Sequence, residues 1–185
     1  VMAKASTLFE IMSKDKVDPD EMMFHMNNDL YQTKTAGMFV TCILGEYDLV
    51  SEEIRWVNAG HQPALIRTQD GKYSEYTSSS TPLGVIKHKD KSVYKLERTK
   101  LSSSRFYIFT DGLSESLDKN GDEIGVEGSI KIIENNFNTD LKKQLKDVTS
   151  EVVKVAGEKN LSDDLTLVGL SLIHISEPTR LDDIA

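Results

Sequence analysis

The chain has 185 residues, of which 38% are hydrophobic and 28% charged, a composition that fits one globular domain and excludes collagen-like, coiled-coil and fully disordered proteins. The formal net charge is -8, so nucleic acid and anionic lipid would repel the chain, and we expect neither as a partner. One cysteine excludes an internal disulfide, and the lack of a signal peptide and of an apolar run of roughly 20 residues predicts a cytoplasmic protein without membrane insertion.

The first part of the chain is predicted to form two helices. Apolar residues recur at helical spacing over residues 1–13 with no capping residue in front, so the chain is expected to begin inside an element, as a fragment of a longer protein would. A second helix is expected from Pro19 to about Thr33, because Asp18 can cap its first turn and Glu21 can complete a capping box. The methionines of this helix are expected to fill the core.

From Gly37 onward the pattern changes to that of β-strands. Short polar turns join the first two strands, and then the next two, into hairpins. The strands are predicted at residues 38–49, 52–58, 64–68, 73–76, 92–97, 105–109 and 165–168. Helical spacing returns at 126–137 and 141–155, where Thr139 is expected to cap the second helix. This order of elements predicts an α+β fold with antiparallel sheets packed on helices, not a doubly wound parallel sheet.

The end of the chain differs from the rest. Residues Leu170–Arg180 read LSLIHISEPTR, which resembles the translation of a transposase adaptor used in preparing sequencing libraries. We therefore expect a domain over residues 1–169 and an adaptor-derived or artefactual tail over residues 170–185 that makes few contacts with it, although the last strand could extend through Leu172. A natural polar tail is the alternative.

A first candidate site residue follows the apolar strand predicted at 105–109. Asp111 comes directly before Gly112, where a glycine lets the backbone turn sharply and another group approach closely. On local grounds alone, an Asp that stabilises a turn through its own side chain is the more common interpretation.

Two adjacent carboxylates, Asp163 and Asp164, open the last predicted strand. Carboxylates against a buried apolar strand repel each other, and a bound Mg²⁺ or Mn²⁺ ion would remove that penalty. The alternative is that one or both of them cap the preceding loop and face water. The residues alone leave the two interpretations open.

Other conspicuous segments carry no chemistry by themselves. Residues 118–122 imitate the start of a calcium loop, but the sixth position lacks the required glycine, so a hairpin-like turn is expected. The segments at 58–63 and 80–84 are predicted to be loops, with His61 as a structural histidine. Cys42 falls in a predicted strand and is expected to be a buried apolar residue.

Five of these segments, taken in their order, resemble one family. They are Gly37–Thr41 (GMFVT), Asn58–His61 (NAGH), Pro82–Gly84 (PLG), Phe109–Leu113 (FTDGL) and Asp163–Thr166 (DDLT). Together they resemble the bacterial stage II sporulation E/sigma-regulator branch of the metal-dependent, PPM-type serine/threonine protein phosphatases. The resemblance extends over about residues 1–169.

The resemblance implies a fold, a reaction and a site. The family fold is a β-sandwich with helices on both outer faces, and Asp residues at one end hold two Mn²⁺ or Mg²⁺ ions. A water bound to these metals attacks phosphoserine or phosphothreonine, so no catalytic residue beyond that water is implied. By this resemblance Asp111 and Asp163 are metal ligands, and Gly112 and Asp164 lie beside them.

The resemblance also implies partners and exposes one gap. Substrates in the family are phosphorylated regulatory proteins, often anti-sigma-factor antagonists. A second copy of the chain, forming a homodimer, is a further candidate partner. Another metal-binding Asp comes from a Gly-Asp strand motif ahead of the helices, and nothing in residues 1–36 matches it. We therefore expect a partial phosphatase domain that lacks an early strand and is catalytically incomplete by itself. The alternative is a non-catalytic protein-interaction module on a phosphatase scaffold.

Overall fold

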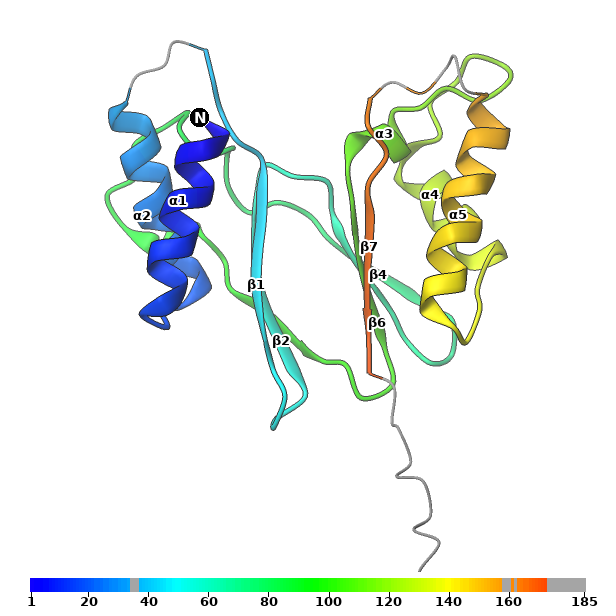
Figure 1. Ribbon diagram of the computed structural model, residues 1–185, viewed down its shortest axis with the longest axis horizontal. Coiled ribbons are helices and arrows are strands. Elements are labelled where there is room, and N and C mark those ends of the chain that lie inside the picture. Colours follow the sequence, from blue (N-terminus) through cyan, green and yellow to red (C-terminus); the bar gives the residue numbers. More distant parts are fainter. Residues whose placement is uncertain (34–36, 158–160, 162, 173–185) are drawn as a thin grey trace, which may run out of the picture.

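Helices and strands form four layers in the computed structural model, which describes residues 1–33, 37–157, 161 and 163–172. Two antiparallel sheets pack face to face, and helices cover the outer face of each sheet (Figure 1). This arrangement confirms the expected α+β class with an antiparallel β-sandwich flanked by helices. Over the described ranges, no helix is both long enough and apolar enough to cross a bilayer.

The first sheet has the strand order β1-β2-β5 and carries two helices on its outer face. These elements are α1 (Met2–Lys14), α2 (Pro19–Gln32), β1 (Cys42–Asp48), β2 (Glu53–Ala59) and β5 (Glu97–Lys100). The methionines of α2 fill the layer between helices and sheet, as predicted. Met22, Met23 and Met26 are at most 4% exposed, and they belong to one apolar cluster with Val57 and Leu83.

The second sheet has the strand order β4-β3-β6-β7 and packs against the C-terminal helices. Its elements and those beside it are β3 (Ala64–Arg67), β4 (Tyr73–Tyr76), β6 (Arg105–Phe109), α3 (Asp111–Ser114), α4 (Gly125–Asn135), α5 (Leu141–Ala156) and β7 (Leu167–Ser171). Ile133 of α4 and the α5 residues Val148 and Val152 are fully buried against Tyr107 and Phe109 of β6. Burial of each such side chain contributes about 1.5–3 kcal/mol, so α4 and α5 are held mainly by this contact.

A third apolar layer joins the two sheets, and Trp56 of β2 is at its centre. The Trp56 side chain is completely buried. Its ring meets Tyr76 and Phe106 of the opposite sheet edge-on, with ring centroids 5.1 and 5.2 Å apart. Edge-to-face pairs of this kind add to the free energy of burial and fix how the two sheets are set against each other.

One predicted strand is wrong. Residues 92–97 do not form a strand; a 3₁₀ turn spans Lys91–Val93, and β5 begins only at Glu97. Asp90 caps the turn by accepting a hydrogen bond of 2.7 Å from the backbone N–H of Ser92. Tyr94 is 2% exposed because it packs, from a loop and not from a strand, into the apolar cluster between α2 and the first sheet. The apolar residues of this segment therefore anchor a loop that packs beside α2.

Asp18 is the residue before α2, as predicted, but its predicted capping bond is absent, and the predicted cap of α5 is wrong. The Asp18 side chain makes no capping hydrogen bond to α2, so no capping box forms. Its Oδ1 instead accepts a hydrogen bond of 3.1 Å from Arg55 of β2. At α5 the cap is Asp140, which accepts from the backbone N–H of Lys143 at 3.1 Å, and not Thr139. The carboxylate of Asp18 is thus taken up by a residue from another element, and the cap of α5 lies one residue after the predicted one.

Strand β7 continues past the predicted domain boundary at residue 169. Leu170 pairs with Phe106 and Ser171 with Arg105, and both Leu170 and Leu172 pack against the layer between the sheets. The strand thus continues to Ser171 and its packing to Leu172, as the expectation of a tail with few contacts had allowed, and that expectation stays a prediction for the residues beyond. The remainder of the predicted tail, residues 173–185, lies outside the described residues.

Candidate active site

The strand connections bring the candidate residues to one end of the sandwich. Only residues 60–63 separate β2 from β3, so β2 ends where β3 begins. Because β6 is antiparallel to β3 and β7 to β6, β6 ends and β7 begins at this same end, beside α3 (Figure 1). Strand β1, antiparallel to β2, also begins here. Asp111 and Asp163 therefore share one end of the sandwich with Thr41 and His61.

Thr110 links the two acidic motifs, which are the segment Phe109–Leu113 with Asp111 and the segment Asp163–Thr166. Its Oγ1 donates a hydrogen bond of 2.8 Å to the carbonyl oxygen of Asp164 and accepts one of 2.9 Å from the backbone N–H of Thr166. Its own backbone N–H donates to the Thr166 carbonyl oxygen at 3.0 Å. These bonds set Asp111, the first residue of α3, beside the segment that carries Asp163.

Gly112 permits a closer approach than any residue with a side chain would. A Cβ at this position would lie 2.5 Å from the carbonyl oxygen of Asp164 and 2.8 Å from that of Asp163. The glycine is buried under this segment, and its N–H donates to the Asp111 carboxylate at 2.9 Å. The expected role of Gly112 in admitting a neighbouring group is thus confirmed.

The side chains of Asp111, Asp163 and Asp164 are exposed. The argument that they lie against a core and need a counter-charge is therefore wrong, since water can solvate them. Their chemistry still fits an ion, because hard carboxylate oxygens are the donors that Mg²⁺ and Mn²⁺ prefer. Within the described ranges, no group of three His, Cys, Asp or Glu side chains is placed to hold a metal. A full ligand set needs further donors, and metal sharing by Asp111 and Asp163 stays a prediction.

The NAGH loop after β2 is held more firmly than an ordinary turn. The Asn58 side chain is 4% exposed, accepts from the backbone N–H of His61 at 2.9 Å, and donates to two loop carbonyl oxygens at 3.3 and 3.0 Å. Gly60 has a φ of +69°, and a Cβ there would lie 2.4 Å from the ring of Pro82. The imidazole Nδ1 of His61 lies 3.2 Å from Thr41 Oγ1.

Two opposing effects act on the imidazole of His61. Burial lowers its pKa below the ordinary 6.5, and the negative charge of Asp111 works in the other direction; burial is the larger effect. Burial therefore favours the neutral ring, and the charge of Asp111 is close enough to act on it. The sequence alone led us to treat His61 as structural. Its position near Asp111 depends on the order of the strands, which no pattern in the neighbouring residues reveals.

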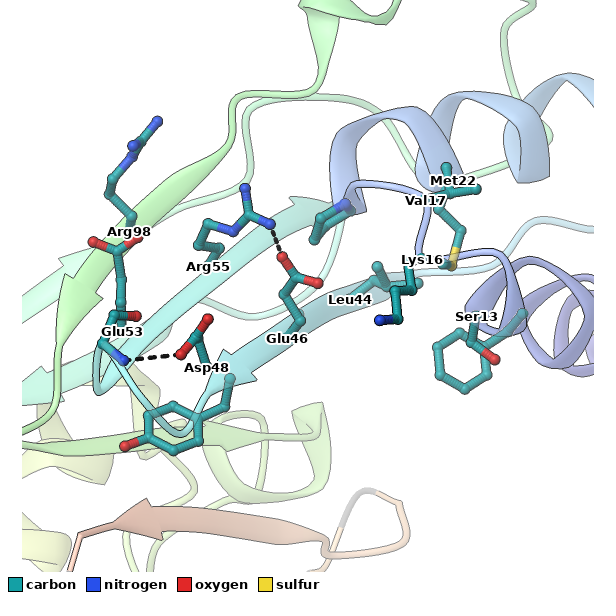
Figure 2. A pocket seen from close by; sticks show the side chains of 15 residues that line it. Ser13, Lys16, Val17, Met22, Leu44, Glu46, Asp48, Glu53, Arg55 and Arg98 are labelled. Carbon is teal, nitrogen blue, oxygen red and sulfur yellow. Dashed lines mark hydrogen bonds and ion pairs between the residues drawn. The ribbon is translucent and has the colours of Figure 1, made fainter.

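A further pocket lies away from this end of the sandwich. It has a volume of about 750 Å³ and lies between the α1–α2 connection and strands β1 and β2. Figure 2 shows the Arg55 guanidinium directed at Glu46, and Asp48 bonded to the hairpin backbone, so these three charged groups have partners within the pocket wall. Asp48 ends β1, about 20 Å along the strand from Thr41. This pocket is separate from the carboxylate end.

Two further sequence predictions concern residues outside the site. Asp118 accepts hydrogen bonds from the backbone N–H groups of Asn120 and Asp122 at 2.7 and 3.1 Å, which confirms a hairpin-like turn there. Cys42 begins β1 and is partly buried against the cluster under the helices. Burial raises the pKa of its thiol to about 11, as expected of an apolar rather than a reactive cysteine.

Comparison with known proteins identifies relatives of the chain. Phosphoserine phosphatase RsbU of Bacillus subtilis is 23% identical over 155 residues, which cover 83% of this chain and 45% of RsbU. Phosphoserine phosphatase RsbP of the same organism is 27% identical over 95 residues, which cover 51% of this chain and 23% of RsbP. The chain therefore spans less than half the length of either relative.

Solved structures show the same fold. The SiaA-PP2C domain of Pseudomonas aeruginosa matches with a TM-score of 0.75 and 14% identity, covering 92% of this chain and 67% of that one. The PP2C phosphatase domain of SpoIIE from Bacillus subtilis, solved with a fragment of its regulatory domain, matches with a TM-score of 0.76 and 18% identity over 92% and 49% of the two chains. The family model of stage II sporulation protein E matches residues 1–172, and the chain belongs to this SpoIIE family.

Proposed function

We propose that this chain is part of a metal-dependent phosphatase that hydrolyses phosphoserine or phosphothreonine on a regulatory protein. The observation that carries the proposal is the junction at Thr110 and Gly112, which holds the two acidic motifs together at one end of the sandwich. The relatives RsbU and RsbP, both phosphoserine phosphatases by name, support the reaction. Anti-sigma-factor antagonists are the class of substrate that the family resemblance implies.

In this proposal Asp111 and Asp163 are ligands of Mn²⁺ or Mg²⁺, with two ions in the site. The chemistry that these ions supply when bound is polarisation of the phosphoryl oxygens and activation of a water for in-line attack. The chain's own contribution is placement, because Gly112 admits the neighbouring backbone and Thr110 keeps the two motifs in register. The carboxylates are exposed, so a phosphorylated side chain on the surface of another protein can reach them.

We also propose that the complete site takes another carboxylate from a segment upstream of residue 1. Two observations support this: the described residues hold no group of three metal-binding side chains, and the chain spans less than half of RsbU. The 185-residue chain alone is expected to bind Mn²⁺ weakly and to show little or no turnover. The full-length protein is expected to be active with Mn²⁺ or Mg²⁺ and to lose its activity in EDTA.

The test is the hydrolysis of a phosphoserine peptide by the full-length protein. Asp111→Asn and Asp163→Asn should abolish turnover, because each removes a charged metal ligand, and Asp164→Asn should cause a smaller loss. Asp122→Asn is the matched control. It makes the same chemical change at an exposed carboxylate of the 118–122 turn, and turnover should be unchanged.

Two results would contradict the proposal. One is turnover that persists in EDTA, and the other is an Asp111→Asn variant as active as the wild type. A folded full-length protein that binds a regulatory partner but hydrolyses nothing with either ion would instead support the alternative of an interaction module.

A further inference from the structure

We propose that His61 binds the substrate, by donating a hydrogen bond from its Nε2–H to the phosphoryl group. The ligand is a phosphate monoester dianion, or the inorganic phosphate that its hydrolysis releases. This inference rests on the proposed phosphatase function, and it adds a residue that neither acidic motif supplies.

The position of His61 is the first support. It follows β2 directly, at the end of the sandwich where β6 delivers Asp111. Asp111 is near enough for its charge to act on the imidazole. A phosphoryl group held by ions at Asp111 would therefore come within reach of a side chain presented from the facing sheet.

The construction of the loop is the second support. Asn58 and Gly60 fix the loop through backbone contacts: Asn58 bonds the N–H and the carbonyl of His61, and the Gly60 N–H donates to Ser78 Oγ at 2.6 Å. None of these bonds uses the imidazole, whose hydrogen bond within the described ranges is to Thr41, in an exposed position. The loop therefore holds the ring in place without depending on the ring for its own stability.

The contact with Thr41 involves only Nδ1 of the His61 ring, which leaves Nε2 for a ligand. When the hydroxyl of Thr41 donates across the 3.2 Å contact to Nδ1, the neutral imidazole of His61 carries its proton on Nε2. Ionised carboxylates accept hydrogen bonds but cannot donate them. An Nε2–H group therefore gives phosphoryl oxygens a donor that the acidic motifs lack.

A matched pair of amide variants separates this role from a purely structural one. In His61→Gln the amide can place an N–H near the position of Nε2, whereas in His61→Asn the amide reaches only the position of Nδ1 and can accept from Thr41. The binding of inorganic phosphate to the Mg²⁺-loaded full-length protein is measured by titration calorimetry. KM and kcat for a phosphoserine peptide and the affinity for Mg²⁺ are measured alongside.

We expect His61→Asn to bind phosphate about 10- to 100-fold more weakly than the wild type, the effect of losing a hydrogen bond to a charged group. We expect His61→Gln to recover most of that affinity, and both variants to bind Mg²⁺ like the wild type. The opposite order, with His61→Asn near wild type and His61→Gln impaired, would show a structural bond to Thr41 and overturn the inference, as would two variants that both bind phosphate normally. A wild-type protein without ion-dependent turnover would refute the proposed function itself, and with it this role.

Discussion

Gly112→Ala is predicted to push the two acidic motifs apart by steric contact alone. Gly112 has no positive φ, so its backbone suits alanine and the added methyl group is the entire change. That carbon would lie 2.5 Å from the carbonyl oxygen of Asp164, where ordinary van der Waals contact begins at 3.4 Å. The neighbouring backbone therefore has to retreat by about 0.9 Å, which exceeds the roughly 0.5 Å within which ligands of a functional site must be held.

The expected loss has two measurable parts. Overpacking of this kind costs about 1–3 kcal/mol, and each kcal/mol lowers the Tm of a domain of roughly 150–250 residues, here the phosphatase domain of the full-length protein, by about 2–4 °C. Displacing Asp163 from Asp111 should weaken Mn²⁺ binding by about 10- to 100-fold, the usual effect of disturbing the residues that support metal ligands. Thermal unfolding and calorimetric titration with Mn²⁺, both on the full-length protein, measure the two quantities.

Gly128→Ala provides the matched control. A Cβ there would lie 2.8 Å from the Cγ2 methyl of Ile124, and rotation of that side chain about χ1 relieves the contact without moving any backbone. Gly128 is inside α4, where alanine is favoured over glycine by up to about 1 kcal/mol. This variant should keep the Mn²⁺ affinity of the wild type and unfold at the same or a higher temperature. If Gly112→Ala behaved like this control, the close approach at Gly112 would not position the site.

Two further predictions concern the ion pair under the second sheet and the single thiol. Glu134→Gln should cost roughly 2 kcal/mol, because Arg67 is 9% exposed and loses the carboxylate that accepts its hydrogen bonds of 2.7 and 2.8 Å. Those bonds hold the pKa of Glu134 below its ordinary 4.5, so its contribution is present above about pH 4.5 and is lost as the pH falls through the lower folded value. The difference in Tm between wild type and variant should therefore shrink from about pH 5 to pH 3, and a constant difference would contradict the assignment. Because the pKa of the Cys42 thiol is about 11, a disulfide reagent at pH 8 should label the native protein slowly and the urea-unfolded protein fast; equal rates would show that the thiol is not shielded.

The strands were predictable where one face or both are buried in a regular pattern. Strand β6 occupies the predicted residues 105–109, since an apolar run between polar neighbours leaves few alternatives. Residues 92–97 misled the prediction because Val93 and Tyr94 are apolar for a contact made by a loop with the cluster between α2 and the first sheet, not because they belong to a strand. Asp18 failed as a cap for a similar reason, since Arg55 competes for its carboxylate from another element. Local patterns carry no information about such long-range partners.

The candidate site shows the same division between local and long-range information. Asp111, Gly112 and Asp163 lie in contiguous motifs, so their types and spacing could be assessed from the sequence. Their apposition depends on Thr110, whose hydrogen-bond partners are 54 and 56 residues away. His61 comes to this end only through the antiparallel order of β2, β3 and β6, and a loop motif by itself does not encode that order.

Trp56 is an intrinsic fluorescence probe of the contact between the two sheets. It is the only tryptophan of the chain, it is fully buried, and its ring touches Tyr76 and Phe106 across the space between the sheets. Indole emission depends on the polarity around the ring, so a change in how the sheets are spaced would alter the fluorescence without any attached label. Ion binding confined to the carboxylate end would leave the emission spectrum unchanged, whereas a shift of one whole sheet would not. One side chain can therefore distinguish a local response from a global one.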